Sequence, residues 1–315
     1  MNEIGGYFGL ELFAGKEYYG EMIPVANGRS ALGYLLQARS IQKLYIPHFL
    51  CGSVAAFCRR AGCQVVYYSI GTDLLPRFEQ VLQSGEYLYI VNYYGQISNA
   101  QILSLQKQYG NVIIDNVQAF FQPPVAGVDT IYSCRKFFGV PDGGYLSTDA
   151  PAVILPKDIS KDRMTHVLGR FECNASDYYD AFKANDHAFM EMEARQMSDL
   201  THNLLRAIDY DTVRKKRNEN YNTLHNQLSC YNGLQLTAPN GAYCYPFYCQ
   251  NGMQIKQLLA QKKIYVATLW PDVLSLDGSL EKDLAENILP LPCDQRYSSE
   301  DMLYVAQEVL QCLNL

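Results

Sequence analysis

The strongest constraint on the fold is a regular alternation of two patterns in the first half of the chain. Runs of apolar, β-branched and aromatic residues predict strands at 44–47, 64–70, 87–94, 112–115, 130–133 and 144–147. Stretches with helical spacing of apolar residues lie between them, at 30–38, 53–61 and 98–109. Alternation of this kind predicts an α/β fold with a mainly parallel sheet that is covered by helices on both faces.

The second half of the chain has a different pattern. A segment rich in proline and charge, 149–163, predicts an exposed connection. It is followed by a predicted helix at 211–229, and we expect the basic run 214–217 to lie on the solvent face of that helix. Short strands are predicted at 242–249 and 264–267, ahead of a terminal helix that contains Met302 and Leu310. We therefore expect a large α/β domain over residues 1–208 and a smaller C-terminal α+β domain over 209–315.

Composition narrows the class of protein. The chain has 315 residues and a net charge of −6 without any basic block, which argues against nucleic acid or an anionic membrane surface as a partner. No apolar run approaches the roughly 20 residues that cross a bilayer, and the N-terminal segment lacks the pattern of a signal peptide. The 10 cysteines form no Cys-x-x-Cys pair, so we expect reduced thiols and no structural metal. A cytoplasmic enzyme is the expectation.

In parallel sheets, ligands bind at the carboxyl ends of the strands, so chemistry is sought there. Gly28 lies at the start of a predicted helix, where free N–H groups and the helix dipole favour phosphate. Asp115 ends a predicted buried strand, where a carboxylate is costly without a cation or a set of donors. Asp115 is either a capped strand end or the carboxylate that keeps a heteroaromatic nitrogen protonated.

A third signal is Ser133-x-x-Lys136, which follows a predicted strand and precedes a glycine-rich turn. The neighbours Phe137 and Phe138 predict a sheltered lysine, which suits Schiff-base chemistry. The alternative is a surface lysine whose ammonium group reaches water. A phosphate-type helix start, a strand-end aspartate and a Ser-x-x-Lys, in this order and each at the edge of a strand, are jointly more specific than any one of them alone.

This order of motifs resembles the DegT-like sugar aminotransferases, a family of fold-type I pyridoxal phosphate enzymes in the aspartate aminotransferase superfamily. The similar segments run from about Gly28 to the C-terminal helix. They are 27–32 (Ser-Gly-Thr-x-Ala-Leu in the family), 46–49 (Val-Pro-x-Phe/Tyr), 93–96 (Leu-Tyr-Gly-Gln), Asp115-x-x-Gln118 (Asp-Ala-Ala-Gln), Ser133 and Lys136 with Gly143-Gly144, and 288–301. Met197-Ser198, Arg217, Tyr221 and Leu224 are similar to a later helical stretch of the family.

The resemblance implies pyridoxal 5′-phosphate as cofactor and a role for each matching residue. Lys136 would form the internal aldimine and later act as general acid and base. Asp115 would pair with the pyridinium nitrogen, and Gln118 would contact the O3′ side of the ring. The backbone of Gly28, Arg29 and Ser30 would hold the phosphate, to which Ser133 would donate.

Two further residues are assigned to the cofactor site. Asn92 follows a predicted strand, so we expect it to reach the cofactor face. Cys51 stands near the position where the family has an aromatic residue on the cofactor, and this departure means that Cys51, or an aromatic residue such as Phe49 or Tyr93, covers the ring.

The resemblance implies an aminotransferase that moves an amino group from a glutamate-like donor to a keto substrate, such as a nucleotide-linked sugar or a related small keto compound, and that works as a homodimer. Two alternatives stay open. One is a pyridoxal-phosphate-dependent sugar dehydratase or lyase, although Lys136 favours transamination. The other is a non-catalytic cofactor-binding protein with a regulatory or partner role, which Cys51 and the short segment ahead of Gly28 motivate.

Overall fold

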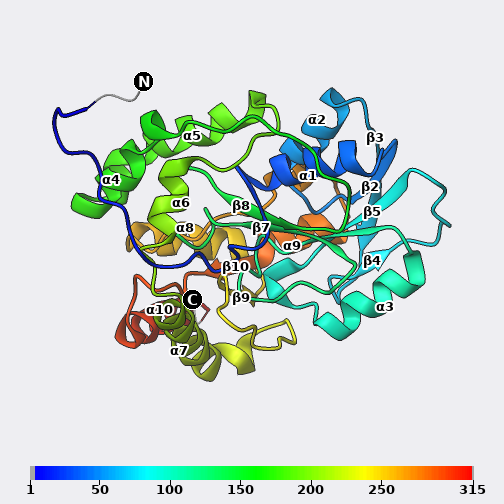
Figure 1. Cartoon of the computed structure of the whole chain (residues 1–315). Helices are drawn as coiled ribbons and strands as arrows, with labels where there is room; N and C mark the ends of the chain where they lie inside the picture. The colour runs from blue at the N-terminus through cyan, green and yellow to red at the C-terminus, as the bar shows by residue number, and fades with distance from the viewer. Residues whose placement is uncertain (1–3, 314–315) are drawn as a thin grey trace.

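The computed structural model describes residues 4–313 and places an eight-stranded sheet at the centre of the molecule, as Figure 1 shows. The strand order is β1-β8-β7-β6-β5-β2-β3-β4. The strands of this sheet are β1 (Ile23–Val25), β2 (Lys43–Pro47), β3 (Gln64–Ile70), β4 (Pro76–Arg77), β5 (Glu86–Val91), β6 (Val112–Asp115), β7 (Asp129–Ser133) and β8 (Gly144–Ser147).

Most of the sheet is parallel. β7, β6, β5, β2 and β3 run in one direction, whereas β8 is antiparallel to β7 and β4 is antiparallel to β3. The predicted fold class is therefore confirmed. Because the parallel strands share a direction, their carboxyl ends meet at one edge, and that edge receives the turns after Pro47, Val91, Asp115 and Ser133.

Helices cover both faces of the sheet. α1 and α2 lie on one face and α3 on the other (Figure 1). The longer helices are α1 (Gly28–Ala38), α2 (Gly52–Arg60), α3 (Asn99–Tyr109), α4 (Thr165–Glu172), α5 (Tyr179–Glu191), α6 (Asp199–Leu205), α7 (Tyr210–Leu228), α8 (Gly252–Gln261), α9 (Leu280–Asn287) and α10 (Ser299–Leu313). None of the helices within residues 4–313 is both long and apolar enough to span a membrane.

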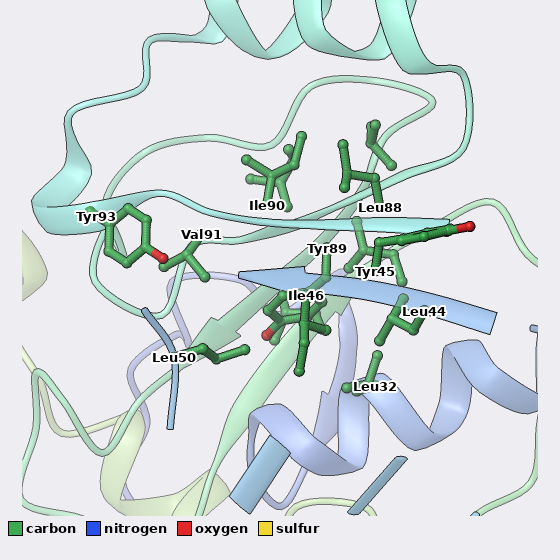
Figure 2. Packing of buried hydrophobic residues seen from close by; sticks show 14 of the residues in the cluster. Leu32, Leu44, Tyr45, Ile46, Leu50, Leu88, Tyr89, Ile90, Val91 and Tyr93 are labelled. Carbon is green, nitrogen blue, oxygen red and sulfur yellow. The ribbon is translucent and has the colours of Figure 1, made fainter. Parts of the chain in front are cut away.

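The sheet is buried on both faces, as its near-continuous apolar strands predict. Figure 2 shows Leu88 and Ile90 of β5 on one side of the strand and Tyr89 and Val91 on the other, and all four side chains are buried. Successive side chains of a strand point to opposite faces, so both faces of β5 need a cover. Leu32 of α1 supplies part of that cover on one face.

The C-terminal part forms an apolar cluster of its own. α7 packs beside α10, and β9 (Tyr245–Tyr248) pairs antiparallel with β10 (Ile288–Leu291). Buried residues between 221 and 312 make up this cluster. The main cluster under the sheet also includes Cys244, Val273 and Leu284 from the C-terminal part, so the two parts share packing. The boundary between 208 and 209 stays a prediction.

Two predicted strands differ from the structure. Residues 264–267 form no strand, and the chain there runs without pairing toward Trp270, whose φ of 53° is left-handed. The strand predicted at 87–94 ends at Val91, because Tyr94 takes a φ of 55° inside a short 3-10 turn.

One prediction about exposure is wrong, and a second holds for most of its residues but not for all of them. Arg217, expected on a solvated helix face, is 1% exposed. The connection 149–163 is partly buried, because Asp158 and Ser160 lie in the interior, where Asp158 pairs with Arg163 and Ser160 bonds to Ser198.

Candidate active site at the carboxyl edge of the sheet

The start of α1 lies against the carboxyl ends of β6 and β7. A Cβ placed on Gly28 would come within 3.5 Å of the side chains of Val117 and Ile131. Val117 lies between Asp115 and Gln118, and Ile131 lies two residues before Ser133. The structure therefore brings the predicted phosphate segment next to the predicted ring-binding segment.

A polar cap shapes the N-terminus of α1. The side chain of Asn27 accepts a hydrogen bond from the N–H of Ser30 at 2.9 Å, a typical N-cap. The N–H groups of Gly28 and Arg29 donate to no protein acceptor within residues 4–313. Two free donors at a helix N-terminus make a favourable environment for an anion.

The Arg29 side chain adds a cation to this place. Its guanidinium group donates no hydrogen bond within the described part of the chain. Burial lowers the pKa of Arg29, and the nearby charges of Arg135 and Asp186 act on it in opposite directions. Arg135 itself pairs with Asp186 at 2.6 Å. A partly buried cation without a carboxylate of its own strengthens the preference of this corner for an anion.

Asp115 ends β6 and is 3% exposed. Its carboxylate accepts hydrogen bonds from the Tyr89 hydroxyl at 2.7 Å and from the Val117 N–H at 2.9 Å. Burial nevertheless raises the pKa of Asp115, against the effect of these two donors and of the nearby Lys136 ammonium. The carboxylate is therefore incompletely stabilised by the protein, and a positive group beside it would favour its charged form.

Lys136 sits in the turn 134–137 after β7, where the N–H of Phe137 bonds to the carbonyl of Cys134 at 3.0 Å. Its side chain is exposed, so the expectation that Phe137 and Phe138 shelter it is wrong, because both rings turn into the interior instead. The Lys136 ammonium lies 5.3 Å from the centre of the Tyr243 ring. Its charge acts on Asp115 and Cys244, which places it on the same edge as Asp115.

Three other predicted residues line the same region. Ser133 is buried at the end of β7, and Ser30 is buried in the first turn of α1, where its hydroxyl accepts from the Arg195 N–H at 3.2 Å. Gln118 is 2% exposed, and its side-chain oxygen accepts from the Tyr94 N–H at 2.8 Å. That bond ties the Gln118 amide to the turn after β5.

Asn92 is a predicted site residue whose side chain is engaged in hydrogen bonds with other parts of the protein. Its side-chain nitrogen donates to Asn116 at 2.9 Å and to Gln122 at 2.8 Å, and its oxygen accepts from the Ile97 N–H at 2.8 Å. The side chain is fully buried. Because these bonds satisfy both ends of its amide, Asn92 braces the turn after β5 and we leave it out of the proposed site.

Cys51 is exposed and precedes the first residue of α2. The two aromatic alternatives are buried: Phe49 and Tyr93 pack on Trp270, with ring centres 4.4 and 5.2 Å from the indole. Among these three candidates, Cys51 is the one whose side chain reaches the surface beside Arg29.

Sequence reasoning missed several residues that shape the site. Asp142 is fully buried and accepts hydrogen bonds from the Ser198 N–H and hydroxyl, so it ties the segment after Lys136 to the start of α6. A Cβ on Gly144 would lie 2.5 Å from the carbonyl oxygen of Tyr132, so close strand pairing requires glycine there. The Gly143-Gly144 pair signalled this turn, whereas nothing local to Asp142 or Tyr243 pointed to their partners.

A cavity of about 720 Å³ lies beside residues 138–140, which follow the turn 134–137 that carries Lys136 (the lysine turn). It does not lie at the carboxyl ends of the parallel strands. It is bounded by Phe138 and Val140 on one side, by α7 residues such as Lys216 on the other, and by Gln295. Lys136, Asp115 and Gln118 do not line it. We therefore place the chemistry by the side chains at the sheet edge and not by this cavity.

Comparison with known proteins separates sequence from fold. No family model matches the chain, and no curated protein matches it. Solved structures match it closely in shape, at low sequence identity. The fold is that of the DegT-type aminotransferases, as the sequence motifs predict.

Three of these structures illustrate the match. The DegT/DnrJ/EryC1/StrS aminotransferase from Brucella abortus has a TM-score of 0.61 at 16% identity, over 92% of this chain and 85% of its own. DesV from S. venezuelae, solved with a ketimine intermediate, has a TM-score of 0.64 at 16% identity, over 92% and 84%. A proposed sugar aminotransferase from Streptococcus pneumoniae, in its PLP form, has a TM-score of 0.62 at 14% identity, over 91% and 86%.

Proposed function

We propose that this chain is a pyridoxal-phosphate-dependent aminotransferase. The observation that carries the proposal is that the charge of Lys136 acts on a buried, incompletely stabilised Asp115 beside the free N–H groups of α1. The fold, shared with aminotransferases, supports it.

The residues at the edge fit this cofactor. Pyridoxal phosphate supplies an electron sink when its ring nitrogen stays protonated. Asp115 would hold that proton in place, because a positive nitrogen beside the carboxylate offsets the burial that raises the pKa of Asp115. Hydrogen bonds from the Tyr89 hydroxyl and the Val117 N–H hold the carboxylate in one orientation.

The phosphate would lie at the start of α1. The N–H groups of Gly28 and Arg29 have no acceptor within residues 4–313, and the Ser133 hydroxyl ends the adjacent strand. The Arg29 guanidinium brings a positive charge to the same corner. These donors match the oxygen atoms of a phosphate dianion.

Lys136 would anchor the cofactor covalently through Nζ and, once released by the amino donor, would take up and return a proton at the same atom. Exposure of its side chain leaves Nζ accessible. The Tyr243 ring, 5.3 Å away, provides a face on which the ammonium can rest between these steps.

The substrate we propose is a keto sugar, in the nucleotide-linked form or a related small keto compound, with a glutamate-like amino donor. The support is the likeness to a structure described as a sugar aminotransferase. We also propose a homodimer in solution, which light scattering at several concentrations would test by a mass near twice 35.7 kDa.

The decisive test is the absorbance of the loaded protein before and after glutamate. We expect a band near ~420 nm, the usual signature of the lysine-bound cofactor, and its loss when glutamate is added. Conversion of a sugar substrate with no amino donor would favour a dehydratase. A band that no donor in a panel of amino acids changes would favour a non-catalytic binding protein.

A further inference from the structure

Arg217 is an unusual residue for its place. It lies in α7, at the end of the basic run 214–217, yet its side chain is 1% exposed. Burial lowers the pKa of Arg217, although an arginine keeps its charge under ordinary conditions. Its polar partners are three backbone carbonyls and the neutral side chain of Gln295. The carboxylate of nearby Asp294 is engaged by Arg296, at 2.7 and 2.9 Å.

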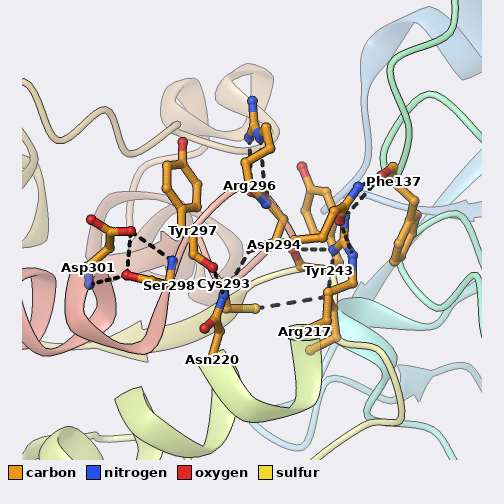
Figure 3. Close-up of polar contacts among 12 residues, drawn as sticks. Phe137, Arg217, Asn220, Tyr243, Cys293, Asp294, Arg296, Tyr297, Ser298 and Asp301 are labelled. Atoms are coloured by element: carbon orange, nitrogen blue, oxygen red, sulfur yellow. Dashed lines mark hydrogen bonds and ion pairs between the residues drawn. The ribbon is translucent and has the colours of Figure 1, made fainter. Parts of the chain in front are cut away.

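The contacts of Arg217 link distant segments, as Figure 3 shows. Nη2 donates to the carbonyl of Phe137 at 3.2 Å, and Nη1 donates to the carbonyl of Ala242 at 2.8 Å. Nε donates to the side-chain oxygen of Gln295 at 2.8 Å. The guanidinium also stacks over the Phe137 ring at 4.5 Å. One buried cation thus joins α7, the lysine turn and two loops of the C-terminal part.

The carbonyl that Arg217 holds belongs to the residue directly after Lys136. That same oxygen accepts a second hydrogen bond, from Gln295 Nε2 at 2.7 Å. The loop held at Ala242 continues into Tyr243, the ring over which the Lys136 ammonium lies. Arg217 therefore fixes Lys136 in two ways: through the backbone of its turn and through the ring beneath its ammonium group.

We propose that Arg217, with Gln295, is a positioning residue that sets the location of Lys136 Nζ relative to Asp115. The inference rests on the proposed function for its meaning and on the geometry for its mechanism. A buried charge is costly, and an apolar residue of similar length often packs as well. The position keeps an arginine because three directed donors are needed to hold a turn and a loop in register.

The test uses Arg217→Met, which keeps the length and removes the donors, and Arg217→Lys, which keeps the charge and some donors. The matched control is Arg214→Met, one turn earlier on α7, where the arginine pairs only with Asp211 in the described part of the chain. The readout is the rate at which the cofactor-free full chain becomes linked to pyridoxal phosphate at Lys136, trapped by borohydride and located by mass spectrometry.

We expect Arg217→Met to slow this reaction by about tenfold to a hundredfold, since a displacement of about 1 Å has effects of that order. Arg217→Lys should recover part of the rate, and Arg214→Met should leave it unchanged. Thermal unfolding measured alongside would show whether stability changes independently. An unchanged rate in a folded Arg217→Met protein would overturn the proposal.

A second variant and a second labelling experiment keep the proposal testable if Arg217→Met does not fold or if no link to the cofactor forms. If Arg217→Met does not fold, Gln295→Met decides, because it deletes one donor to the Phe137 carbonyl; we expect about a fivefold loss of rate, and an unchanged rate would contradict the proposal. If the unaltered protein forms no link at all, the proposed function fails. The positioning claim is then judged by acetic anhydride labelling of Lys136 across pH, which must differ between the unaltered protein and Arg217→Met or the claim fails too.

Discussion

Two buried charges lie beside the lysine turn, and the protein treats them differently. Burial disfavours the charged form of both groups, because it raises the pKa of Asp115 and lowers the pKa of Arg217. At the sheet edge, Asp115 accepts two hydrogen bonds within the described part of the chain, although a carboxylate has room for about four. Arg217 lies in α7, on the other side of the lysine turn, and donates hydrogen bonds from all three of its nitrogen atoms. Buried polar groups are normally satisfied within the protein, so an under-stabilised one marks a place for a ligand. A buried charge whose donors all find partners, such as Arg217, holds the surrounding backbone in place.

The strongest way to break this comparison is to remove the lysine between the two charges. Lys136→Ala should abolish the borohydride-reducible link to pyridoxal phosphate, because Nζ is the only proposed anchor. Lys107→Ala, an exposed lysine of α3, is the control and should keep the link. A Lys136→Ala protein that still carries a reducible link would contradict the site.

The next effect comes from Asp115→Asn, which removes the charge and keeps the shape. We expect the reaction with glutamate to slow by about two to three orders of magnitude, because a preorganised charge beside the ring nitrogen is lost. Stopped-flow absorbance measures it. Asp129→Asn, a buried carboxylate at the opposite end of the neighbouring strand, should alter stability and not this rate. Equal slowing by both variants would contradict the proposed role of Asp115 beside the ring nitrogen.

A pH experiment sharpens the contrast with a third buried charge, Lys256. It donates to the Ala285 carbonyl at 2.9 Å, and burial lowers its pKa from 10.5 to about 8. Between these values the unfolded chain binds the proton at Lys256 and the folded chain does not, so the contribution of Lys256 to stability should rise with pH across this window. The contribution of Lys256 rises by at most about 3.5 kcal/mol, from 10.5 − 8 pKa units at about 1.4 kcal/mol each.

Urea unfolding from pH 7 to 11 measures this contribution as the difference between the unaltered protein and Lys256→Met, because buried thiols such as Cys249 and Cys293, whose pKa burial raises, make the total stability fall over the same range. Relative to Lys256→Met, the unaltered protein should gain stability as the pH rises, whereas Lys107→Met, at an exposed position, should keep the profile of the unaltered protein. An identical pH profile for Lys256→Met would show that this lysine is not the group responsible.

The smallest effect concerns the helix caps. Asn27→Ala should cost about 1 kcal/mol, because the cap bond to the Ser30 N–H is lost. Ser98→Ala, which removes the cap of α3 far from the proposed phosphate, should cost a similar amount. Only Asn27→Ala should also weaken cofactor affinity, measured by equilibrium dialysis. Equal cofactor affinities in the two variants would contradict the proposal that the start of α1 binds the phosphate.

The sequence predicted the sheet well because its strands are buried runs. Three strands, β3, β6 and β8, match the predicted bounds to the residue. The order of Gly28, Asp115, Ser133 and Lys136 was readable because each follows or precedes a strand in a known direction. The segment 264–267 has the apolar character of a strand, yet no neighbour pairs with it, and strand character alone cannot show this.

Other features depend on contacts between distant residues. Arg217 looked like a solvated cation because its partners at 137, 242 and 295 lie far from it in sequence. Asn92 had the position of a site residue, but its partners at 116 and 122 consume its amide. Lys136 was expected to be sheltered, and only the packing of Phe137 and Phe138 into the interior shows that it is not.

The central claim is that Lys136 carries the cofactor beside Asp115. Its most direct test is to load the purified protein with pyridoxal 5′-phosphate, reduce it with borohydride and map the phosphopyridoxyl group by peptide mass spectrometry. The account predicts one modified residue, Lys136, with loss of the modification when glutamate is added before reduction. Modification spread over surface lysines, or none at Lys136, would contradict it.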